Sequence, residues 1–372
     1  MGHWTVKRRR VRRGARTSFR DSVGIGVLAS LVAACGAPPD TAADPASDPA
    51  PPARSADGRT PATMSEPAGN APSTALERVT PRSLGQIGAR FCHARPAPDT
   101  ERPRTVAERG NPDGRLAEAR FGPEAVGGRP AKLAAFPGIL KLESRRLTAT
   151  GGPQTGHCGA VRIAPRWALT AAHCVDGEVD RLTLIAGVAD LRQTQAAYEL
   201  TGKVALCHAA YGGDADGFRN DLALIRLSDR TRPAADHAVP LANLVPTSRT
   251  LSPQTYQTAD MAGWGLTAFD GGLSRQLLSA ELTVAEVTET EIVVTSRAGA
   301  GPCLGDSGGP LYVVEPDGRR VLVGLLSTVE PDADGRYCQG AYRGRFVNLQ
   351  AYGDWIERVM ATCDASPELC EP

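Results

Sequence analysis

The pattern of hydrophobic and polar residues predicts many short β-strands in the part of the chain that begins near residue 125. Four apolar runs there alternate with turns rich in Gly, Asp and Pro, namely GILKLE (138–143), ALIRLS (223–228), LTVAEV (282–287) and EIVVTS (291–296). Short runs bounded by turn residues are typical of strands. The stretch 311–328 holds two more β-rich runs around EPDGRR and predicts a hairpin.

One helix is predicted near the end of the chain, in the segment YGDWIERVMATC (352–363). Its residues Trp355, Ile356, Val359 and Met360 recur at helical spacing. Many short strands followed by one terminal helix predict an all-β barrel or sandwich domain of about 240 residues.

The first 34 residues predict an export signal. They carry one Lys, seven Arg and one Asp, a net charge of +7, which leaves −6 for the rest of a chain whose total is +1. The basic run is followed by the apolar stretch SVGIGVLASLVAA (22–34), which is too short to span a bilayer comfortably. The remainder of the chain is mildly acidic and gives no reason to expect binding to nucleic acid.

The junction LVAAC (31–35) resembles the bacterial lipoprotein box, in which cleavage precedes a Cys that then carries lipid. The resemblance implies that Cys35 is the membrane anchor and that the protein lies in the bacterial cell envelope. An ordinary secretory cleavage, with Cys35 incidental, is the alternative. The chain has nine Cys, so a lipidated Cys35 leaves eight that can pair in an exported protein.

Two segments separate this signal from the strand-rich region. Residues 35–75 are rich in Pro, Ala, Asp, Ser and Thr and have almost no large apolar side chain, so we expect a disordered tether. Residues 76–124 are rich in Arg and interrupted by Pro, and we interpret them as a pro-segment.

Three short motifs hold residues suited to nucleophilic catalysis. LTAAHC contains His173, NDLALIRL contains Asp221 and GDSGGP contains Ser307. A serine hydroxyl becomes a strong nucleophile when an imidazole removes its proton, and a buried carboxylate fixes the tautomer of that imidazole. The glycines beside Ser307 leave backbone N–H groups free to stabilise an oxyanion.

These motifs resemble those of the trypsin/chymotrypsin-like serine proteases, over roughly residues 125–363. The order His, Asp, Ser matches that family and differs from the subtilisin and α/β-hydrolase orders. AGWG (262–265) is similar to the family's Gly-Trp-Gly turn, and AYGDWI (351–356) to its terminal helix. The resemblance implies two antiparallel six-stranded β-barrels with a C-terminal helix and the triad in the cleft between them, which leaves 364–372 as a C-terminal tail.

The same resemblance implies a role for each residue. His173 is the general base and acid, Asp221 orients it and Ser307 attacks the substrate carbonyl. The N–H groups of Gly305 and Ser307 form the oxyanion hole, and Ser327 hydrogen-bonds the triad carboxylate.

The resemblance also implies two disulfides. One pairs Cys158 with Cys174 beside the catalytic His, and the other pairs Cys303 with Cys338 beside the specificity pocket. Four cysteines have no family counterpart: Cys363 and Cys370 are close enough in sequence to pair, which would leave Cys92 for Cys207, but pairs of Cys207 with Cys363 or Cys370 stay open.

The segment EAVGGRPA (124–131) resembles the family's mature N-terminus. Cleavage before Ala125 would free an ammonium that pairs with Asp306 and orders the oxyanion loop. Two departures weaken the match, because Ala125 is smaller than the usual aliphatic residue and Glu124 is not basic. The alternative is that 125–131 is only a turn and the start of a strand.

Alignment to the family places Gly301 at the base of the primary specificity pocket and Val329 and Gly340 on its walls. An uncharged base gives a substrate Arg or Lys no counter-ion, and Val329 narrows the pocket. We therefore expect cleavage after small or medium uncharged residues such as Ala, Val or Leu.

The sequence thus predicts an exported, membrane-tethered serine endopeptidase that acts on protein or peptide substrates through an acyl-enzyme. We expect no cofactor and no metal, because Val188 stands where animal relatives place the first carboxylate of a calcium loop. Two other classes use the same residues: a catalytically inactive binding protein on a protease scaffold, and an esterase.

Overall fold

The structure is a computed structural model that describes residues 83–92, 104–105, 128–147, 153–230, 236, 239–268, 271–296, 300–331, 337–338 and 343–371. All of these belong to one compact unit, Ala75–Pro372. The predicted export signal and tether, together with Cys35, Ala125 and Gly340, lie outside the described residues. No helix within the described ranges has both the length and the apolar character needed to cross a bilayer.

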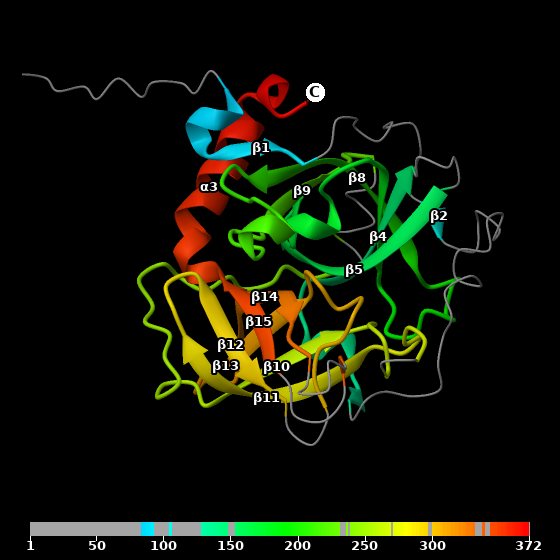
Figure 1. The fold of residues 1–372 in the computed structure, drawn as a ribbon. Coiled ribbons are helices and arrows are strands. Elements are labelled where there is room, and N and C mark those ends of the chain that lie inside the picture. The colour runs from blue at the N-terminus through cyan, green and yellow to red at the C-terminus, as the bar shows by residue number, and fades with distance from the viewer. Residues whose placement is uncertain are drawn as a thin grey trace, which may run out of the picture. The chain divides into compact units, whose positions relative to one another are not determined.

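The first half of this unit is a closed six-stranded antiparallel barrel (Figure 1). Its strands are hydrogen-bonded in the order β8-β7-β4-β5-β6-β9, and pairing of β8 with β9 closes the ring. The strands are β4 (Ile139–Leu147), β5 (Pro153–Ala164), β6 (Trp167–Thr170), β7 (Val179–Ala186), β8 (Tyr198–His208) and β9 (Ala223–Leu227).

The second half is another closed six-stranded antiparallel barrel, hydrogen-bonded in the order β10-β13-β14-β15-β12-β11 with β10 paired to β11. The short strand β3 (Arg129–Pro130) extends it beside β11. Two barrels and one C-terminal helix confirm the predicted fold class, and the 311–328 hairpin forms as expected. The strands are β10 (Thr258–Gly263), β11 (Leu278–Val287), β12 (Glu291–Thr295), β13 (Pro310–Val314), β14 (Arg320–Val329) and β15 (Arg343–Asn348).

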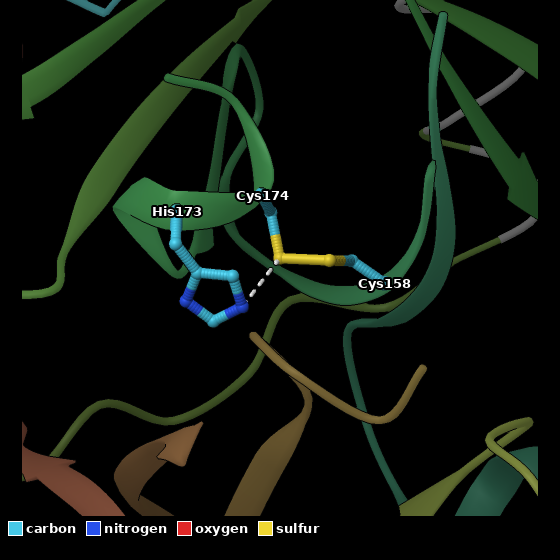
Figure 2. A group of neighbouring side chains, drawn as sticks. All are labelled: Cys158, His173 and Cys174. Carbon is cyan, nitrogen blue, oxygen red and sulfur yellow. Dashed lines mark hydrogen bonds between the residues drawn. A yellow bond between two sulfur atoms is a disulfide. The ribbon is translucent and has the colours of Figure 1, made fainter. Parts of the chain in front are cut away.

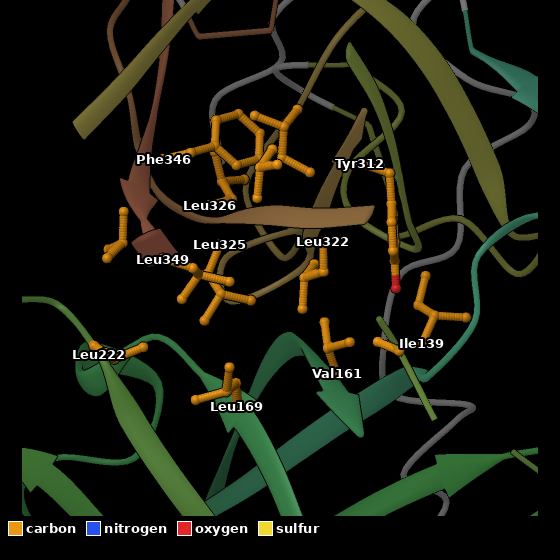
Figure 3. Packing of buried hydrophobic residues seen from close by; sticks show 14 of the residues in the cluster. Ile139, Val161, Leu169, Leu222, Tyr312, Leu322, Leu325, Leu326, Phe346 and Leu349 are labelled. Carbon is orange, nitrogen blue, oxygen red and sulfur yellow. The ribbon is translucent and has the colours of Figure 1, made fainter. Parts of the chain in front are cut away.

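The two barrels meet through apolar side chains (Figure 3). Val161 and Leu169 of the first barrel pack in one buried cluster with Leu322 and Leu325 of the second. The Tyr312 hydroxyl also donates a hydrogen bond to the carbonyl oxygen of Pro137, just before β4. Burial of these apolar side chains fixes the position of one barrel relative to the other.

The C-terminal helix α3 runs from Leu349 to Ala365, longer than predicted. Asn348 caps it, because its side-chain oxygen accepts a hydrogen bond from the backbone N–H of Gln350 at 3.2 Å. Its buried face includes Trp355, Ile356 and Val359, as the helical spacing indicates.

Part of the predicted pro-segment packs on the first barrel. After a 3₁₀ turn η1 (Leu84–Ile87), strand β1 (Ala89–Phe91) pairs antiparallel with β8. The Gly88 carbonyl accepts a hydrogen bond from Trp355 Nε1 on α3 at 2.8 Å, which ties this segment to the terminal helix as well (Figure 1). A second short strand, β2 (Arg104–Thr105), also pairs with β8.

The structure resolves the open cysteine pairings. Cys158–Cys174 and Cys303–Cys338 form as the family resemblance implies. The remaining four form Cys92–Cys207, which joins the pro-segment to β8, and Cys363–Cys370, which folds the tail back on α3. The tail contains a short 3₁₀ turn η5 (Pro367–Leu369), and Glu371 bridges Lys203 and Arg226 of the first barrel.

We predict that the Cys92–Cys207 bridge stabilises the fold more than Cys363–Cys370. Their sequence separations are 115 and 7 residues, so the first restricts the unfolded chain far more. The chain-entropy relation gives about 5 kcal/mol for the long loop and about 2 kcal/mol for the short one. Urea unfolding of the two double Cys→Ala variants compares them; equal losses of unfolding free energy would contradict the docked pro-segment.

Candidate active site

His173 and Asp221 come from the first barrel and are joined by two hydrogen bonds. His173 lies on the 3₁₀ turn η3 (Ala172–Cys174) directly after β6, and Asp221 lies two residues before β9. Nδ1 of His173 is 2.7 Å from Oδ2 of Asp221, and the His173 backbone N–H donates to Oδ1 at 2.9 Å. The fully buried carboxylate therefore fixes both the ring and the backbone of the histidine.

Ser327 of the second barrel completes the environment of this carboxylate. Its hydroxyl donates a hydrogen bond to Oδ2 of Asp221 at 2.6 Å, from near the end of β14. The expected contact is therefore present, and it crosses from one barrel to the other. Three hydrogen-bonding contacts therefore satisfy this carboxylate despite its burial.

Ser307 lies in the loop between β12 and β13, against the first barrel. Its carbonyl oxygen accepts a hydrogen bond from Gly159 N–H at 2.7 Å, and Gly308 N–H donates to Leu326 O at 2.7 Å. Gly308 has φ +74° and no space for a side chain, since a Cβ there would lie 2.3 Å from Oγ1 of Thr170. This close approach explains the glycine after the serine and holds the loop of Ser307 against the first barrel.

The Cys158–Cys174 disulfide lies beside the histidine ring (Figure 2). The sulfur of Cys174 is 3.7 Å from Nε2 of His173 and 3.7 Å from the carbonyl oxygen of Ser307. Nε2 and the backbone of Ser307 therefore share one neighbour. The described residues form no direct hydrogen bond between Ser307 Oγ and His173 Nε2, and such bonds often tighten only when substrate binds.

The same three residues, Cys158, His173 and Cys174, bring their possible ligand atoms within 4.8 Å of one another. The two sulfurs are joined in a disulfide, so neither is a thiolate, which is the form that ligates metal. In the loop that calcium-binding relatives use, Val188 is buried in the core and Asp190 is paired with Arg192.

The carboxylate of Asp306 organises the loop that carries Gly305 and Ser307. It is buried, and it accepts hydrogen bonds from Gly265 N–H at 2.7 Å and Cys303 N–H at 3.0 Å. Burial raises the pKa of Asp306 to about 6. The two hydrogen bonds lower this pKa, but their effect is smaller than that of burial. Gly305 has φ +94°, a conformation that glycine adopts readily.

A small cavity borders Asp306 and is lined also by Gly128, Gly263 and Gly301. Gly128 is three residues after the predicted mature start, which itself lies outside the described residues. The cavity is therefore close to where a new N-terminus would have to enter.

The register of the second barrel places a glycine beside Val329 that sequence reasoning missed. Val329 on β14 pairs with Gly344 on β15, not with a residue near Gly340. A Cβ at Gly344 would lie 3.1 Å from Cγ of Pro302. The insertion EPDADGRY (330–337) obscured this pairing in the sequence, although the isolated glycine in RGRF (343–346) is a signal for close backbone approach.

Phe218 is a second residue without a sequence-based assignment. Its ring meets the His173 imidazole edge-on, with centroids 5.7 Å apart and planes at 68°. Phe218 has φ +57°, between Gly217 at φ +62° and a further left-handed residue, Asn220. The Gly- and Asp-rich segment YGGDADGFRN (211–220) is typical of a turn, but its sequence does not show that the Phe218 ring points toward His173.

Comparison with known proteins agrees with this geometry. The family model described as Trypsin matches residues 125–356, well over half of the chain. The chain belongs to the trypsin family. It is a serine endopeptidase of that family.

Its relatives include granzyme M from Rattus norvegicus, 28% identical over 264 residues that cover 67% of this chain and 93% of the relative. Granzyme M from Homo sapiens is 30% identical, with 64% of this chain and 90% of the relative covered. Neutrophil elastase from Mus musculus is 29% identical, with 64% and 83% covered. A solved structure titled "Structure of GrC" matches with a TM-score of 0.50 and 24% identity, over 63% of this chain and 99% of that chain, and supports the fold.

Proposed function

We propose that this endopeptidase works through a triad of His173, Asp221 and Ser307. The observation that carries the proposal is the buried Asp221 carboxylate, which holds Nδ1 of His173 at 2.7 Å and leaves Nε2 as the ring nitrogen available for proton transfer. A carboxylate in this position fixes the tautomer and stabilises the imidazolium.

In the proposed reaction, Oγ of Ser307 attacks the substrate carbonyl carbon while its proton passes to Nε2 of His173. The tetrahedral intermediate collapses to an acyl-enzyme as Nε2 returns that proton to the leaving amine. Water then repeats the sequence and releases the acid. The N–H groups of Gly305 and Ser307 are proposed as the oxyanion hole, in agreement with the left-handed Gly305 that sets the direction of this loop.

We predict that a fluorophosphonate probe labels the wild type at Ser307 and leaves Ser307→Ala unlabelled. Asp221→Asn should lower kcat about 10⁴-fold, the scale known for related triads, because the imidazole then adopts the wrong tautomer. Mass spectrometry of the labelled peptide and steady-state kinetics measure the two effects.

The same assays separate the competing functions. An inactive binding protein would show no labelling of a folded wild type. An esterase would hydrolyse an ester but not a peptide with the same acyl group. Ser327→Ala is a useful companion variant, because it removes one hydrogen bond to Asp221 and leaves the side chains of the three triad residues unchanged.

We propose a specificity pocket with Gly301 at its base and the cross-strand neighbours Val329 and Gly344 on its wall; Gly340 remains a proposed wall residue. The Val329–Gly344 register supports this arrangement, and Pro302 packs against Gly344. With no acidic group at Gly301, a substrate Arg or Lys would lose its hydration without gaining a counter-ion.

We predict that peptides with Ala, Val or Leu before the scissile bond are cleaved with higher kcat/KM than otherwise identical peptides with Arg or Lys. Val329→Gly should increase the preference for large apolar residues relative to Ala by about tenfold, the scale of one or two methylene groups in a pocket. A wild type that prefers Arg would contradict the assignment of Gly301.

We propose activation by cleavage between Glu124 and Ala125, with the new ammonium of Ala125 paired to Asp306. Support comes from the cavity that joins Gly128 to the Asp306 carboxylate. Because Cys92–Cys207 is formed, the pro-segment would stay attached to the protease after this cut. N-terminal sequencing of active enzyme tests the position of the cut.

We also propose export and lipid anchoring through Cys35 in the bacterial cell envelope. The four disulfides fit an oxidising compartment, and they account for every cysteine except Cys35.

We predict that fatty-acid labelling in a bacterial host marks the wild type and not Cys35→Ser, because thioether attachment needs the sulfur. Sequencing of the mature wild type should show that residues 1–34 have been removed. Equal labelling of the two proteins, or of neither, would contradict the anchor.

A further inference from the structure

A buried lysine lies on the face of the first barrel that is turned toward the second. Along β4, Leu140 and Leu142 pack in the core of the first barrel, whereas Ile139 packs in the cluster shared with the second. Alternation along a strand puts Lys141 on the same face as Ile139. Lys141 is only 2% exposed, which is rare for a lysine.

The register shows where its side chain points. Lys141 lies directly opposite Gly159 on β5, so the two residues face the same way. A Cβ on Gly159 would lie 2.7 Å from Cα and 2.8 Å from N of Gly309. Lys141 therefore projects toward the segment that holds Asp306 and Ser307, and the missing side chain at 159 provides the space.

The ammonium has no hydrogen-bond partner among the described residues, although it is fully enclosed. Burial lowers the pKa of Lys141 to about 8, while the charges of Glu143 and Asp306 raise it. Lys141 is thus a cation at neutral pH whose stabilisation comes from nearby carboxylates rather than from hydrogen bonds.

Two other titratable groups face this site. Glu143 follows on the same face of β4, and His157 on β5 lies opposite it, with Nδ1 3.8 Å from Oε1 of Glu143. Burial, together with the charge of Lys141, lowers the pKa of His157 to about 4, so its imidazole is neutral. On the other side, β7 presents only the uncharged Thr183 and Ile185 opposite Glu143 and Lys141.

We propose that Lys141 is a positioning residue that keeps Asp306 ionised and, through it, holds the N–H groups of Gly305 and Ser307 in place. Both hydrogen-bond donors to the Asp306 carboxylate are neutral backbone groups. A nearby cation stabilises such a carboxylate further, and within the described chain the cation that lowers the pKa of Asp306 is Lys141. The inference rests on the proposed triad, because Asp306 adjoins its nucleophile.

The pH consequence has a definite sign. Without the Lys141 charge, the pKa of Asp306 rises further above about 6, so the carboxylate stays protonated to a higher pH. The ammonium of Ala125, where it is present, acts in the same direction as Lys141, so each comparison must use protein with the same N-terminus. Lys141 itself stays charged below about pH 8.

The test compares pH profiles of kcat/KM for the wild type, Lys141→Met and Lys141→Arg, with the exposed Lys132→Met as a matched control. The acid limb of Lys141→Met should move up by about one pH unit, the effect of one nearby opposite charge. Activity at pH 6 then falls about tenfold and recovers toward pH 8. Lys141→Arg and Lys132→Met should follow the wild type.

A double variant shows through which group Lys141 acts. In an Asp306→Asn background, Lys141→Met should shift the acid limb no further, measured by the rate of fluorophosphonate labelling. A shift that persists there, or an unchanged limb in Lys141→Met itself, would overturn the inference. If Lys141→Met does not fold, Lys141→Gln is judged by the same criteria. A folded wild type that neither labels nor cleaves would instead refute the proposed triad.

Discussion

The buried carboxylate of Asp221 is the contact on which the candidate site depends, because it links the two barrels at His173. His173 donates to it from the first barrel, through its backbone and its ring, and Ser327 donates from the second. Each barrel is closed by its own hydrogen bonds, so their relative position rests on the contacts between them. A shift of one barrel would leave this charge with fewer donors inside a medium of low polarity, which is costly. The apolar cluster around Leu322 and Val161 and the polar contact at Asp221 therefore favour the same arrangement.

The loop around Ser307 also depends on a buried carboxylate, but this one has fewer hydrogen-bond donors than Asp221. Its carboxylate, Asp306, is buried with two backbone donors, and the adjacent face of β4 and β5 adds Lys141, Glu143 and a neutral His157. Such groups interact strongly because little water separates them. Under the proposed role of Lys141, the arrangement of the loop around Ser307 therefore depends on the protonation state of Asp306. The carboxylates of Glu143 and Asp306 offset the charge of Lys141, which is otherwise unfavourable in this buried position.

Local sequence signals predicted most of the strands and the candidate site. The contacts that depend on pairing between distant strands could not be predicted in this way. The apolar runs and the hairpin at 311–328 follow from alternation and turn residues, and the motifs around His173, Asp221 and Ser307 name the candidate site because short motifs carry the chemistry. Gly344, the partner of Val329, lies beyond the insertion at 330–337, so counting from Cys338 did not find it. The local sequence does not distinguish Lys141 from an exposed polar residue of a strand. Its burial depends on Gly159, which lies opposite it and 18 positions later in the chain. The Cys92–Cys207 pair was one of several choices until the strands were placed.

The strand β1 moves the beginning of the folded unit well ahead of the family match, which starts at residue 125. A recombinant chain that starts at Ala125 would contain every proposed catalytic residue yet lose Cys92 and the carbonyl of Gly88. Cys207, fully buried, would then be a free thiol, and Trp355 Nε1 on α3 would lose its acceptor. A free thiol in an oxidising medium invites mispairing during refolding. Expression for biochemical work should therefore start before η1, at or ahead of Ser83.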